Sequence, residues 1–197
     1  MKIKQLMEGL DIIGMLPEFK DTDVKRISCD SRDVTPGTVF VAVRGPIQDG
    51  HKYIDDAVKR KACAIILEDM SFKSLEGFGV PFIIVKDSKE ALNKITDIFF
   101  GHPYQSIKCV GITGTNGKTT VSYLVKSILN TAGIKCGLIG TIGYKVQEEN
   151  LKTNNTTPGV LELHALMSNM VQAGDTYVAL EVSSHALDQQ RVDGIIF

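Results

Sequence analysis

The stretch VGITGTNGKTT, residues 110–120, connects a strand-like apolar run to the start of an amphipathic helix. The general phosphate-loop pattern requires a glycine, four residues and then Gly-Lys-Ser/Thr. Counted back from Gly117-Lys118-Thr119, that first glycine falls at position 112, where the chain has isoleucine. Phosphate binding itself requires a buried strand, a turn without bulky side chains and a helix whose first amides face the anion. The stretch meets these requirements and predicts a nucleotide site.

Each residue type in this loop suits a bound triphosphate. Gly114 and Gly117 permit unusual backbone angles and a close approach of the chain. The Lys118 amine can reach the β- and γ-phosphates, and the Thr119 hydroxyl can bind Mg²⁺. The plainer alternative is a structural turn between strand and helix with an exposed lysine. The candidate ATP-binding residues are Gly114, Thr115, Asn116, Gly117, Lys118, Thr119 and Thr120.

A carboxylate that completes the site is expected at the end of a neighbouring strand. The run YVALEVSSH, residues 177–185, places Glu181 directly after apolar residues. Parallel strands present ligands at their carboxyl ends and Mg²⁺ prefers oxygen, so Glu181 and Thr119 are candidate metal ligands. An ordinary acid at a strand end is the alternative. His185 either approaches the metal or substrate, or satisfies a hydrogen bond in a turn.

The composition is that of a soluble, folded protein. Of 197 residues, 43% are hydrophobic and 23% are charged, and the formal net charge is -1. This balance gives no electrostatic reason to expect nucleic acid or an anionic membrane as a partner. Cys29, Cys63, Cys109 and Cys136 stand far apart in apolar contexts, which favours buried free thiols over metal ligands or disulfides. With no convincing signal peptide and no membrane-length apolar run, we expect a cytoplasmic protein.

The N-terminal part of the chain alternates strand-like and helical patterns. Strands are expected at residues 38–43, 62–67 and 82–85, with a helix between the first two. A longer helix follows, for which Ser88 is the expected N-cap. Gly101-His102-Pro103 would stop this helix. We therefore expect one domain at residues 1–101 and a second at 102–197.

The second part repeats strand and helix more regularly, which predicts a mainly parallel sheet with helices on both faces. A later helix is expected to have Thr157 as N-cap and Pro158 at its first position. The chain ends within VDGIIF, residues 192–197, which has the pattern of another buried strand, so we expect a fragment of a longer protein. The apolar face of the helix after the loop is expected to consist of Val121, Leu124, Val125, Ile128, Leu129 and Ala132.

Four stretches resemble one family. GITGTNGKTT, residues 111–120, is similar to the ATP loop of the Mur ligases and the folylpolyglutamate synthetases, whose pattern is G-x-T-G-T-[NK]-G-K-[ST]. This version of the loop accounts for the unusual glycine spacing. Residues 29–66, from CDSRD to ACAII, resemble the UDP-binding domain shared by several Mur ligases. NNTTP, residues 154–158, and EVSSHALDQQRV, residues 181–192, narrow the resemblance to the UDP-N-acetylmuramoyl-tripeptide synthetases.

The resemblance implies a fold and an activity. The implied α/β fold is a small N-terminal UDP-binding domain followed by the first part of a P-loop-type, mainly parallel-sheet ATPase domain. Such enzymes add meso-diaminopimelate or L-lysine to UDP-N-acetylmuramoyl-L-alanyl-D-glutamate in peptidoglycan synthesis. ATP phosphorylates the glutamyl carboxylate, and the amine of the incoming amino acid attacks the acyl phosphate.

The resemblance also implies the cofactors and the oligomeric state of the enzyme. ATP and Mg²⁺ are the implied cofactors, the assembly is expected to be a monomer, and neither nucleic acid nor membrane insertion is expected. A lysine that the family carbamylates and the whole amino-acid domain would lie beyond residue 197. We therefore expect this chain alone to be unable to complete ligation.

Site residues are carried over by the same resemblance. Lys118 and Glu181 are the implied catalytic residues, and the metal ligands would be Thr119, Glu181 and His185. Cys29 can offer little beyond packing, so a contact through its backbone is expected. The implied substrate-binding residues are Cys29, Ser31, Ile47, Gln48, Asp49, Asn155, Thr156, Thr157, Ser183, Gln189 and Arg191.

Three alternatives stay open from sequence alone. Another Mur ligase or a folylpolyglutamate synthetase would share the ATP loop, but the folate enzymes lack the segment DSRDVTPGTVFVAVRG. A generic P-loop ATPase or kinase would need neither EVSSH nor the uridine segment. The third alternative is a non-catalytic nucleotide-binding module.

Overall fold

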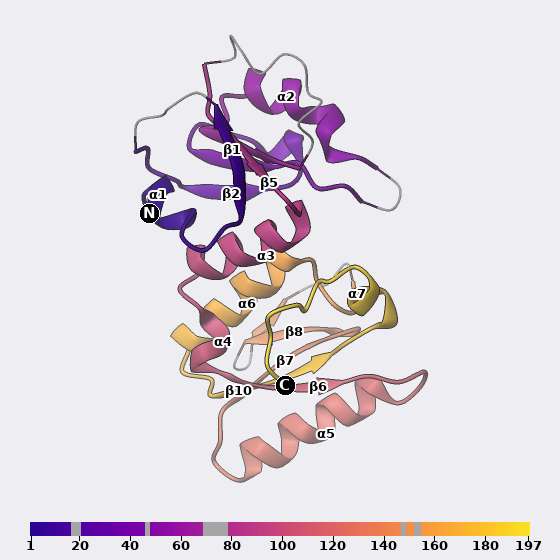
Figure 1. Ribbon diagram of the computed structural model, residues 1–197. Helices are drawn as coiled ribbons and strands as arrows, with labels where there is room; N and C mark the ends of the chain where they lie inside the picture. Colours follow the sequence, from indigo (N-terminus) through magenta and orange to yellow (C-terminus); the bar gives the residue numbers. More distant parts are fainter. Residues whose placement is uncertain (17–20, 46–47, 69–78, 147–148, 152–154) are drawn as a thin grey trace. The chain divides into compact units, whose positions relative to one another are not determined.

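The computed structural model describes residues 1–197 except 17–20, 46–47, 69–78, 147–148 and 152–154. The chain divides into two units, Met1–Phe99 and Phe100–Phe197, and each contains a sheet with helices packed on it (Figure 1). Among the described helices, none has both the length and the apolar character needed to cross a bilayer.

The first unit is built on a five-stranded sheet in the order β1-β5-β4-β3-β2. Strands β2 to β5 pair in parallel, and β1 is an antiparallel edge strand beside β5. In chain order its elements are α1 (Ile3–Leu6), β1 (Ile12–Leu16), β2 (Arg26–Ser28), η1 (Ser31–Asp33), β3 (Thr38–Val41), η2 (Gly50–Tyr53), α2 (Ile54–Lys59), β4 (Ala64–Leu67), β5 (Phe82–Val85) and α3 (Ser88–Phe99).

The three central strands of this sheet confirm the expected apolar runs. Every residue of β3, β4 and β5 is buried, as is typical of parallel strands covered on both faces. Phe40, Ile65 and Phe82 from these strands form one core cluster with Ile54 of α2. Burial of β-branched and aromatic side chains therefore holds the carboxyl ends of these strands at one edge.

The N-cap of α3 differs from the sequence expectation. The carboxylate of Asp87 accepts hydrogen bonds from the backbone N–H groups of Lys89 (2.8 Å) and Glu90 (3.0 Å), so Asp87 caps the helix. Ser88 is instead fully buried, and both its N–H and its hydroxyl donate to Glu68 Oε2 at 2.9 Å. The serine joins the helix to the end of β4.

The second unit has a five-stranded sheet in the order β6-β10-β7-β8-β9. Strands β6, β10 and β7 are parallel, and β8 and β9 continue the sheet as antiparallel strands. The mainly parallel α/β arrangement is thus confirmed. In chain order its elements are α4 (Pro103–Ser106), β6 (Lys108–Ile112), α5 (Lys118–Thr131), β7 (Cys136–Gly140), β8 (Gly143–Val146), β9 (Glu149–Leu151), α6 (Val160–Gln172), β10 (Tyr177–Glu181) and α7 (Ser184–Asp188).

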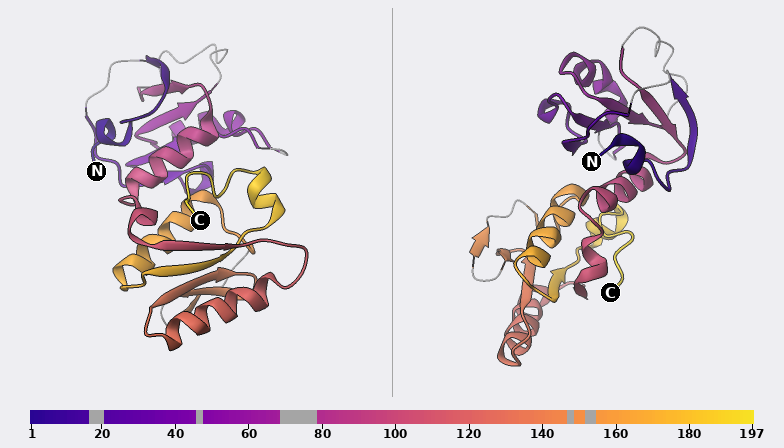
Figure 2. Two further views of the ribbon diagram at one scale, coloured as in Figure 1. Left: turned by 60° about the horizontal axis from the view of Figure 1, so that its bottom comes forward. Right: turned by 90° about the vertical axis from the view of Figure 1, so that its left-hand side faces the viewer.

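Helices cover both faces of this second sheet (Figure 2). Along β10, Val178 and Leu180 belong to the core cluster that contains the apolar residues of α6. Ala179, between them, belongs to the cluster against which Val125 and Leu129 of α5 pack. This alternation is the period of two expected for a strand between two layers, and it places β10 at the centre of the unit.

Two local expectations for the second unit are wrong. Helix α6 begins at Val160 after Gly159, so Thr157 is not its N-cap. The Thr157 hydroxyl instead bonds to the end of β10, as described below, and is therefore not available to cap the helix. Residues 192–197 form turns and irregular chain rather than a strand, although Val192 and Ile195 are buried.

The orientation of α5 also departs from its apolar pattern. Val125 and Leu129 pack towards the sheet, but Leu124 and Ile128 are 55% and 67% exposed. Polar residues take the remaining inward positions: Ser122 is fully buried, and the Lys126 amine donates to the carbonyl oxygen of Cys136. Hydrogen bonds to backbone groups allow these polar side chains to be buried there.

The prediction of four buried free thiols is only partly confirmed. All four cysteines are free, and Cys109 and Cys136 are buried, but Cys63 is half-buried and Cys29 is exposed. Desolvation raises the pKa of both Cys63 and Cys109 to about 11, so these thiols stay protonated at neutral pH.

A matched pair of isoleucine substitutions tests the orientation of α5. Ile139→Ala in β7 removes a fully buried side chain and should lower the free energy of unfolding by about 2–5 kcal/mol. Ile128→Ala in α5 should change it by less than about 0.5 kcal/mol, because that side chain is exposed. Denaturant titration measures both. Equal costs would show that the outer face of α5 is packed.

Candidate functional site

The glycine loop lies between β6 and α5, as the sequence predicts. Gly117 is the N-cap of α5 with φ 80°, and Gly114 has φ 145°, both backbone angles that favour glycine. Thr115 and Asn116 between them are exposed. The loop therefore presents an open backbone at the start of a 14-residue helix, where the helix dipole favours an anion.

Lys118, the first residue of α5, is folded back over this loop. Its Nζ donates a hydrogen bond to the carbonyl oxygen of Gly114 at 2.7 Å. The ammonium group is thus held at the loop itself, near where phosphate oxygens would lie. A bound polyphosphate would compete with the Gly114 carbonyl for this donor.

Glu181 ends strand β10, which lies between the parallel strands β6 and β7, and is fully buried. Its Oε2 accepts hydrogen bonds from the hydroxyls of Thr119 (3.1 Å) and Thr141 (3.0 Å), and Oε1 accepts from the Thr141 backbone N–H (3.2 Å). Ser122 Oγ lies 3.4 Å from Oε1 but is closer to the Thr119 carbonyl, at 2.8 Å. Donors from α5 and from the turn after β7 therefore converge on one carboxylate.

The two predicted oxygen ligands are hydrogen-bonded to each other, at a spacing that one Mg²⁺ ion would also allow. Thr119 Oγ1 and Glu181 Oε2 are 3.1 Å apart. Adjacent ligands of an octahedral Mg²⁺ with bonds of about 2.1 Å are about 3 Å apart, so both oxygens can coordinate one ion. His185 is exposed on α7, and no cluster of three or more His, Cys, Asp or Glu side chains occurs in the described part of the chain. A metal role for His185 stays a prediction.

The predicted substrate residues of the second unit gather at the end of β10. The buried Thr157 hydroxyl donates to the Glu181 carbonyl at 2.7 Å and accepts from the Ser183 N–H at 3.0 Å. Arg191 donates through Nη1 to the Thr157 carbonyl at 2.8 Å and through Nε and Nη2 to Gln189 Oε1 at 3.0 and 2.6 Å. Arg191 is thus part of a hydrogen-bonded network.

The residues that precede Thr157 connect to the turn after β7. Thr156 Oγ1 lies 3.1 Å from Thr141 Oγ1, and the Asn155 carbonyl accepts a bond from the Tyr144 hydroxyl at 3.1 Å. Asn155 is otherwise exposed. Thr141 was not among the predicted residues, although the rule that identified Glu181 applies to it, because Thr141 directly follows the neighbouring parallel strand.

In the first unit the predicted uridine residues follow neighbouring parallel strands. Cys29 and Ser31 come after β2, and Gln48 and Asp49 come after β3, so both pairs belong to the same edge of the sheet. Ser31 is buried. Ile47 lies outside the described residues.

Asp49 is held by His51, a residue that was not among the predicted site residues. His51 Nδ1 is 2.6 Å from Asp49 Oδ1, and His51 Nε2 accepts the Glu68 backbone N–H at 3.2 Å. That acceptor role fixes the proton on Nδ1, which donates to Asp49. Desolvation opposes ionisation of Asp49, but the hydrogen bonds from His51 and the charge of Arg44 outweigh it and lower the pKa.

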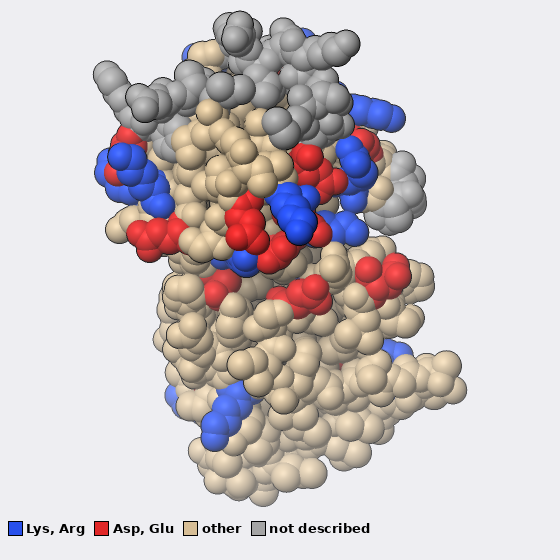
Figure 3. Space-filling model, viewed as in Figure 1, with Lys and Arg blue, Asp and Glu red and all other residues tan. Residues whose placement is uncertain are grey.

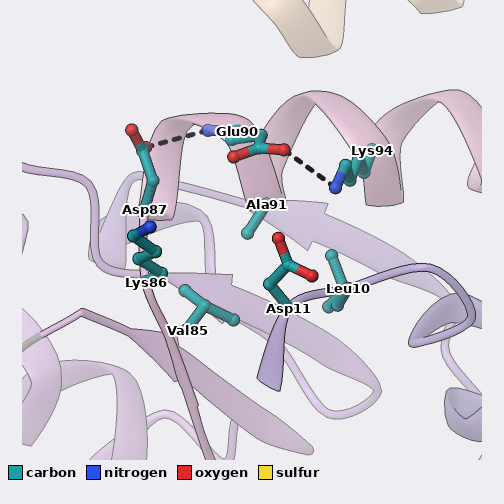
Figure 4. Close-up of a pocket in the computed structure, with 8 residues that line it drawn as sticks. All are labelled: Leu10, Asp11, Val85, Lys86, Asp87, Glu90, Ala91 and Lys94. Carbon is teal, nitrogen blue, oxygen red and sulfur yellow. Dashed lines mark hydrogen bonds and ion pairs between the residues drawn. The ribbon is translucent and has the colours of Figure 1, made fainter. Parts of the chain in front are cut away.

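Two depressions in the described part of the surface differ greatly in size. A groove of about 520 Å³ lies beside the glycine loop and is lined by Thr119, Thr120, Tyr123, Leu124, Ser127 and Ile142. The other, between β5 and α3 and drawn in Figure 4, has a volume of about 10 Å³, room for about one water molecule. Its rim carries the 2.8 Å ion pair of Glu90 and Lys94.

Charge is unevenly distributed over the surface. On the face seen in Figure 3, acidic and basic side chains gather over the first unit, interleaved rather than separated by sign. The second unit shows a largely uncharged face in the same view.

Comparison with known proteins identifies similar sequences along most of the chain. Residues 112–197 match the Mur ligase middle domain, and residues 23–100 match the Mur ligase family, catalytic domain. The chain is 44% identical over 196 residues to the UDP-N-acetylmuramoyl-L-alanyl-D-glutamate--2,6-diaminopimelate ligase of Parabacteroides distasonis, covering 97% of this chain and 40% of that protein. It is 45% identical over 194 residues to the ligase of that name from Listeria innocua, covering 98% of this chain and 38% of the relative.

Solved structures agree with the sequence matches. A UDP-N-acetylmuramoyl-L-alanyl-D-glutamate--2,6-diaminopimelate ligase has TM-score 0.68 and 25% identity, covering 91% of this chain and 37% of that one. MurF ligase from Thermotoga maritima in complex with ADP has TM-score 0.51 and 26% identity, covering 84% and 34%. The chain thus spans 38–40% of the length of the two curated relatives.

Gly140, at the end of β7, makes room for the buried carboxylate, and this can be tested. A Cβ at this position would overlap Glu181 Oε1, so Gly140→Ala should lower the free energy of unfolding by about 1–3 kcal/mol. The same substitution in a Glu181→Ala background should cost clearly less, because the overlapping group is gone. Denaturant titration of the four proteins gives both values. Equal costs in the two backgrounds would contradict the assigned contact.

Proposed function

The chain belongs to the Mur ligase family, and we propose that it forms part of an ATP-dependent ligase of peptidoglycan precursor synthesis. The proposed reaction joins meso-diaminopimelate to UDP-N-acetylmuramoyl-L-alanyl-D-glutamate. Diaminopimelate is preferred over L-lysine because the relatives from Parabacteroides distasonis and Listeria innocua are both named for it. The main support in the structure is the convergence of Thr119 and Thr141 on Glu181 beside the glycine loop.

The nucleotide part of the proposal rests on the loop and the start of α5. Backbone N–H groups at the helix start would bind phosphate oxygens, and Lys118 would exchange its bond to Gly114 for one to the β- or γ-phosphate. Thr119 and Glu181 would hold the divalent cation, which neutralises charge on the phosphates when bound. The relative from Thermotoga maritima, which was solved with ADP, supports a nucleotide at this fold.

Each unit carries its own proposed residues for the acceptor substrate. We assign the uridine end to the first unit, Met1–Phe99, through Cys29, Ser31, Gln48 and Asp49. The muramoyl-dipeptide is assigned to the residues around the end of β10 in the second unit. There the bonds to Thr157 and Gln189 use three of the five N–H donors of Arg191, which leaves donors suited to a carboxylate or phosphate.

The proposed chemistry needs little from this chain beyond positioning and charge. The glutamyl carboxylate of the acceptor would take the γ-phosphoryl group, with ADP as the leaving group, and become an acyl phosphate. The amine of diaminopimelate would then attack its carbonyl carbon, and the amide would form with release of phosphate and of one amine proton. Lys118 would stabilise negative charge on the transferring phosphoryl group. We place this reaction in the cytoplasm, where ATP and the nucleotide-linked precursor are made, and we propose that the enzyme acts as a monomer.

Two lysines provide a matched test of the nucleotide site. Lys118→Ala should weaken binding of Mg·ATP on the order of 10- to 100-fold, because a hydrogen bond from a charged donor is lost. Lys135→Ala should leave binding unchanged, because this exposed lysine precedes β7 at the opposite edge of the sheet. Isothermal titration calorimetry gives both affinities. If the Lys118→Ala variant bound Mg·ATP with the affinity of the wild type, the loop would have only a structural role.

A second titration tests the acceptor substrate. UDP-N-acetylmuramoyl-L-alanyl-D-glutamate should bind the wild-type chain saturably, and Arg191→Ala should weaken it on the order of 10-fold or more through loss of charged donors and of the Thr157 contact. Arg191→Lys should recover only part of the affinity, since lysine cannot reproduce the paired bonds. A folded chain that binds Mg·ATP but not this substrate would favour a plain nucleotide-binding module.

A further inference from the structure

Thr141 occupies a position between the candidate metal carboxylate and the candidate substrate residues. It stands in the turn between β7 and β8. Its hydroxyl is 3.0 Å from Glu181 Oε2 on one side and 3.1 Å from Thr156 Oγ1 on the other. Its backbone N–H, 3.2 Å from Glu181 Oε1, fixes the turn against the same carboxylate.

The hydroxyls of Thr141 and Thr156 have one proton each, and this limits the hydrogen-bonding arrangements that they can form with Glu181. A threonine hydroxyl has one proton to donate, so Thr141 can donate either to Glu181 or to Thr156. An ionised carboxylate only accepts, so when Thr141 donates to Glu181, a bond between the two threonines forms only if the Thr156 hydroxyl donates to Thr141. Thr156 then presents only lone pairs to a ligand. When Thr141 donates to Thr156 instead, the Thr156 proton becomes available to a ligand oxygen.

The competition at Glu181 decides between these states. Oε2 accepts from Thr119 and from Thr141, and it is also the oxygen whose spacing to Thr119 suits a cation. A cation that coordinates Oε2 compensates its negative charge and weakens the hydrogen bond from Thr141 to this oxygen. The Thr141 hydroxyl can then donate to Thr156 Oγ1, which lies 3.1 Å away. The hydroxyl of Thr156 is then free to donate to an anionic oxygen of a substrate.

We propose that Thr141 is a positioning residue that couples the state of Glu181 to the hydrogen-bonding polarity of Thr156. The inference rests on the proposed function, because it assumes a nucleotide-bound cation at Glu181 and a substrate at Thr156. Beyond the proposed function, it adds Thr141 as a functional residue and predicts that binding of the nucleotide with its cation makes the Thr156 hydroxyl available as a donor to the substrate. Such coupling is reciprocal, so changes at Thr156 must in turn affect nucleotide binding.

This reciprocity gives a test that does not depend on catalysis. Thr156→Val removes the alternative acceptor, which keeps the Thr141 proton on Glu181 and should weaken Mg·ATP binding on the order of 3- to 10-fold, the effect of one hydrogen bond. In a Thr141→Val background the same Thr156→Val substitution should change the affinity less than about 2-fold, because the connection is already absent. Calorimetric titration of the four proteins with Mg·ATP completes the cycle.

Serine variants separate coupling from packing. Thr141→Ser and Thr156→Ser keep the hydroxyls and should bind Mg·ATP as the wild type does. If the two threonines mattered only for packing, the serine variants, which lose a methyl group, would bind more weakly, and the valine variants, which keep the volume, would not. Unfolding free energies of all variants establish that each is folded. An effect of Thr156→Val that is the same in both Thr141 backgrounds, or no effect in either, overturns the inference while the proposed function stands. A wild-type chain that fails to bind Mg·ATP overturns both.

Discussion

The second unit depends on satisfying one buried carboxylate. Glu181 has no exposed surface, and burying an ionised group without partners would cost more than the fold could sustain. Its partners come from different elements: Thr119 from α5 and Thr141 from the turn after β7, while Gly140 leaves the space it needs. The requirement to solvate this group by protein donors therefore fixes the start of α5 against the ends of two strands.

The parallel sheet explains why those partners meet. Strands β6, β10 and β7 run in the same direction, so the loop, Glu181 and Thr141 all follow carboxyl ends at one edge. The backbone of β10 extends the same arrangement, because the Glu181 carbonyl receives the Thr157 hydroxyl and the Thr157 carbonyl receives Arg191. Candidate nucleotide and substrate residues are thus connected through a single strand end.

Much of this was predictable from the sequence, and the failures have physical causes. The loop, Glu181 and the α/β class followed from strand and helix patterns, since those patterns reflect burial. The pairing of His51 with Asp49, and the use of Thr157 by β10 rather than by α6, depend on contacts between segments that no local pattern records. The face of α5 was mispredicted for a related reason: periodicity locates an apolar stripe, but Ser122 and Lys126 could be buried instead once backbone and carboxylate acceptors were within reach.

The hydrogen bonds within the site also bear on what binding can gain. Lys118 already bonds to Gly114, and the hydroxyls of Thr119 and Thr141 already bond to Glu181. A ligand would therefore exchange existing bonds for new ones, and the net gain per bond is small when both states are satisfied. The larger gain must come from charge, because a polyphosphate offers the Lys118 ammonium an anionic acceptor in place of a neutral carbonyl. The exchange at Lys118 is therefore expected to gain more than an exchange between two neutral acceptors.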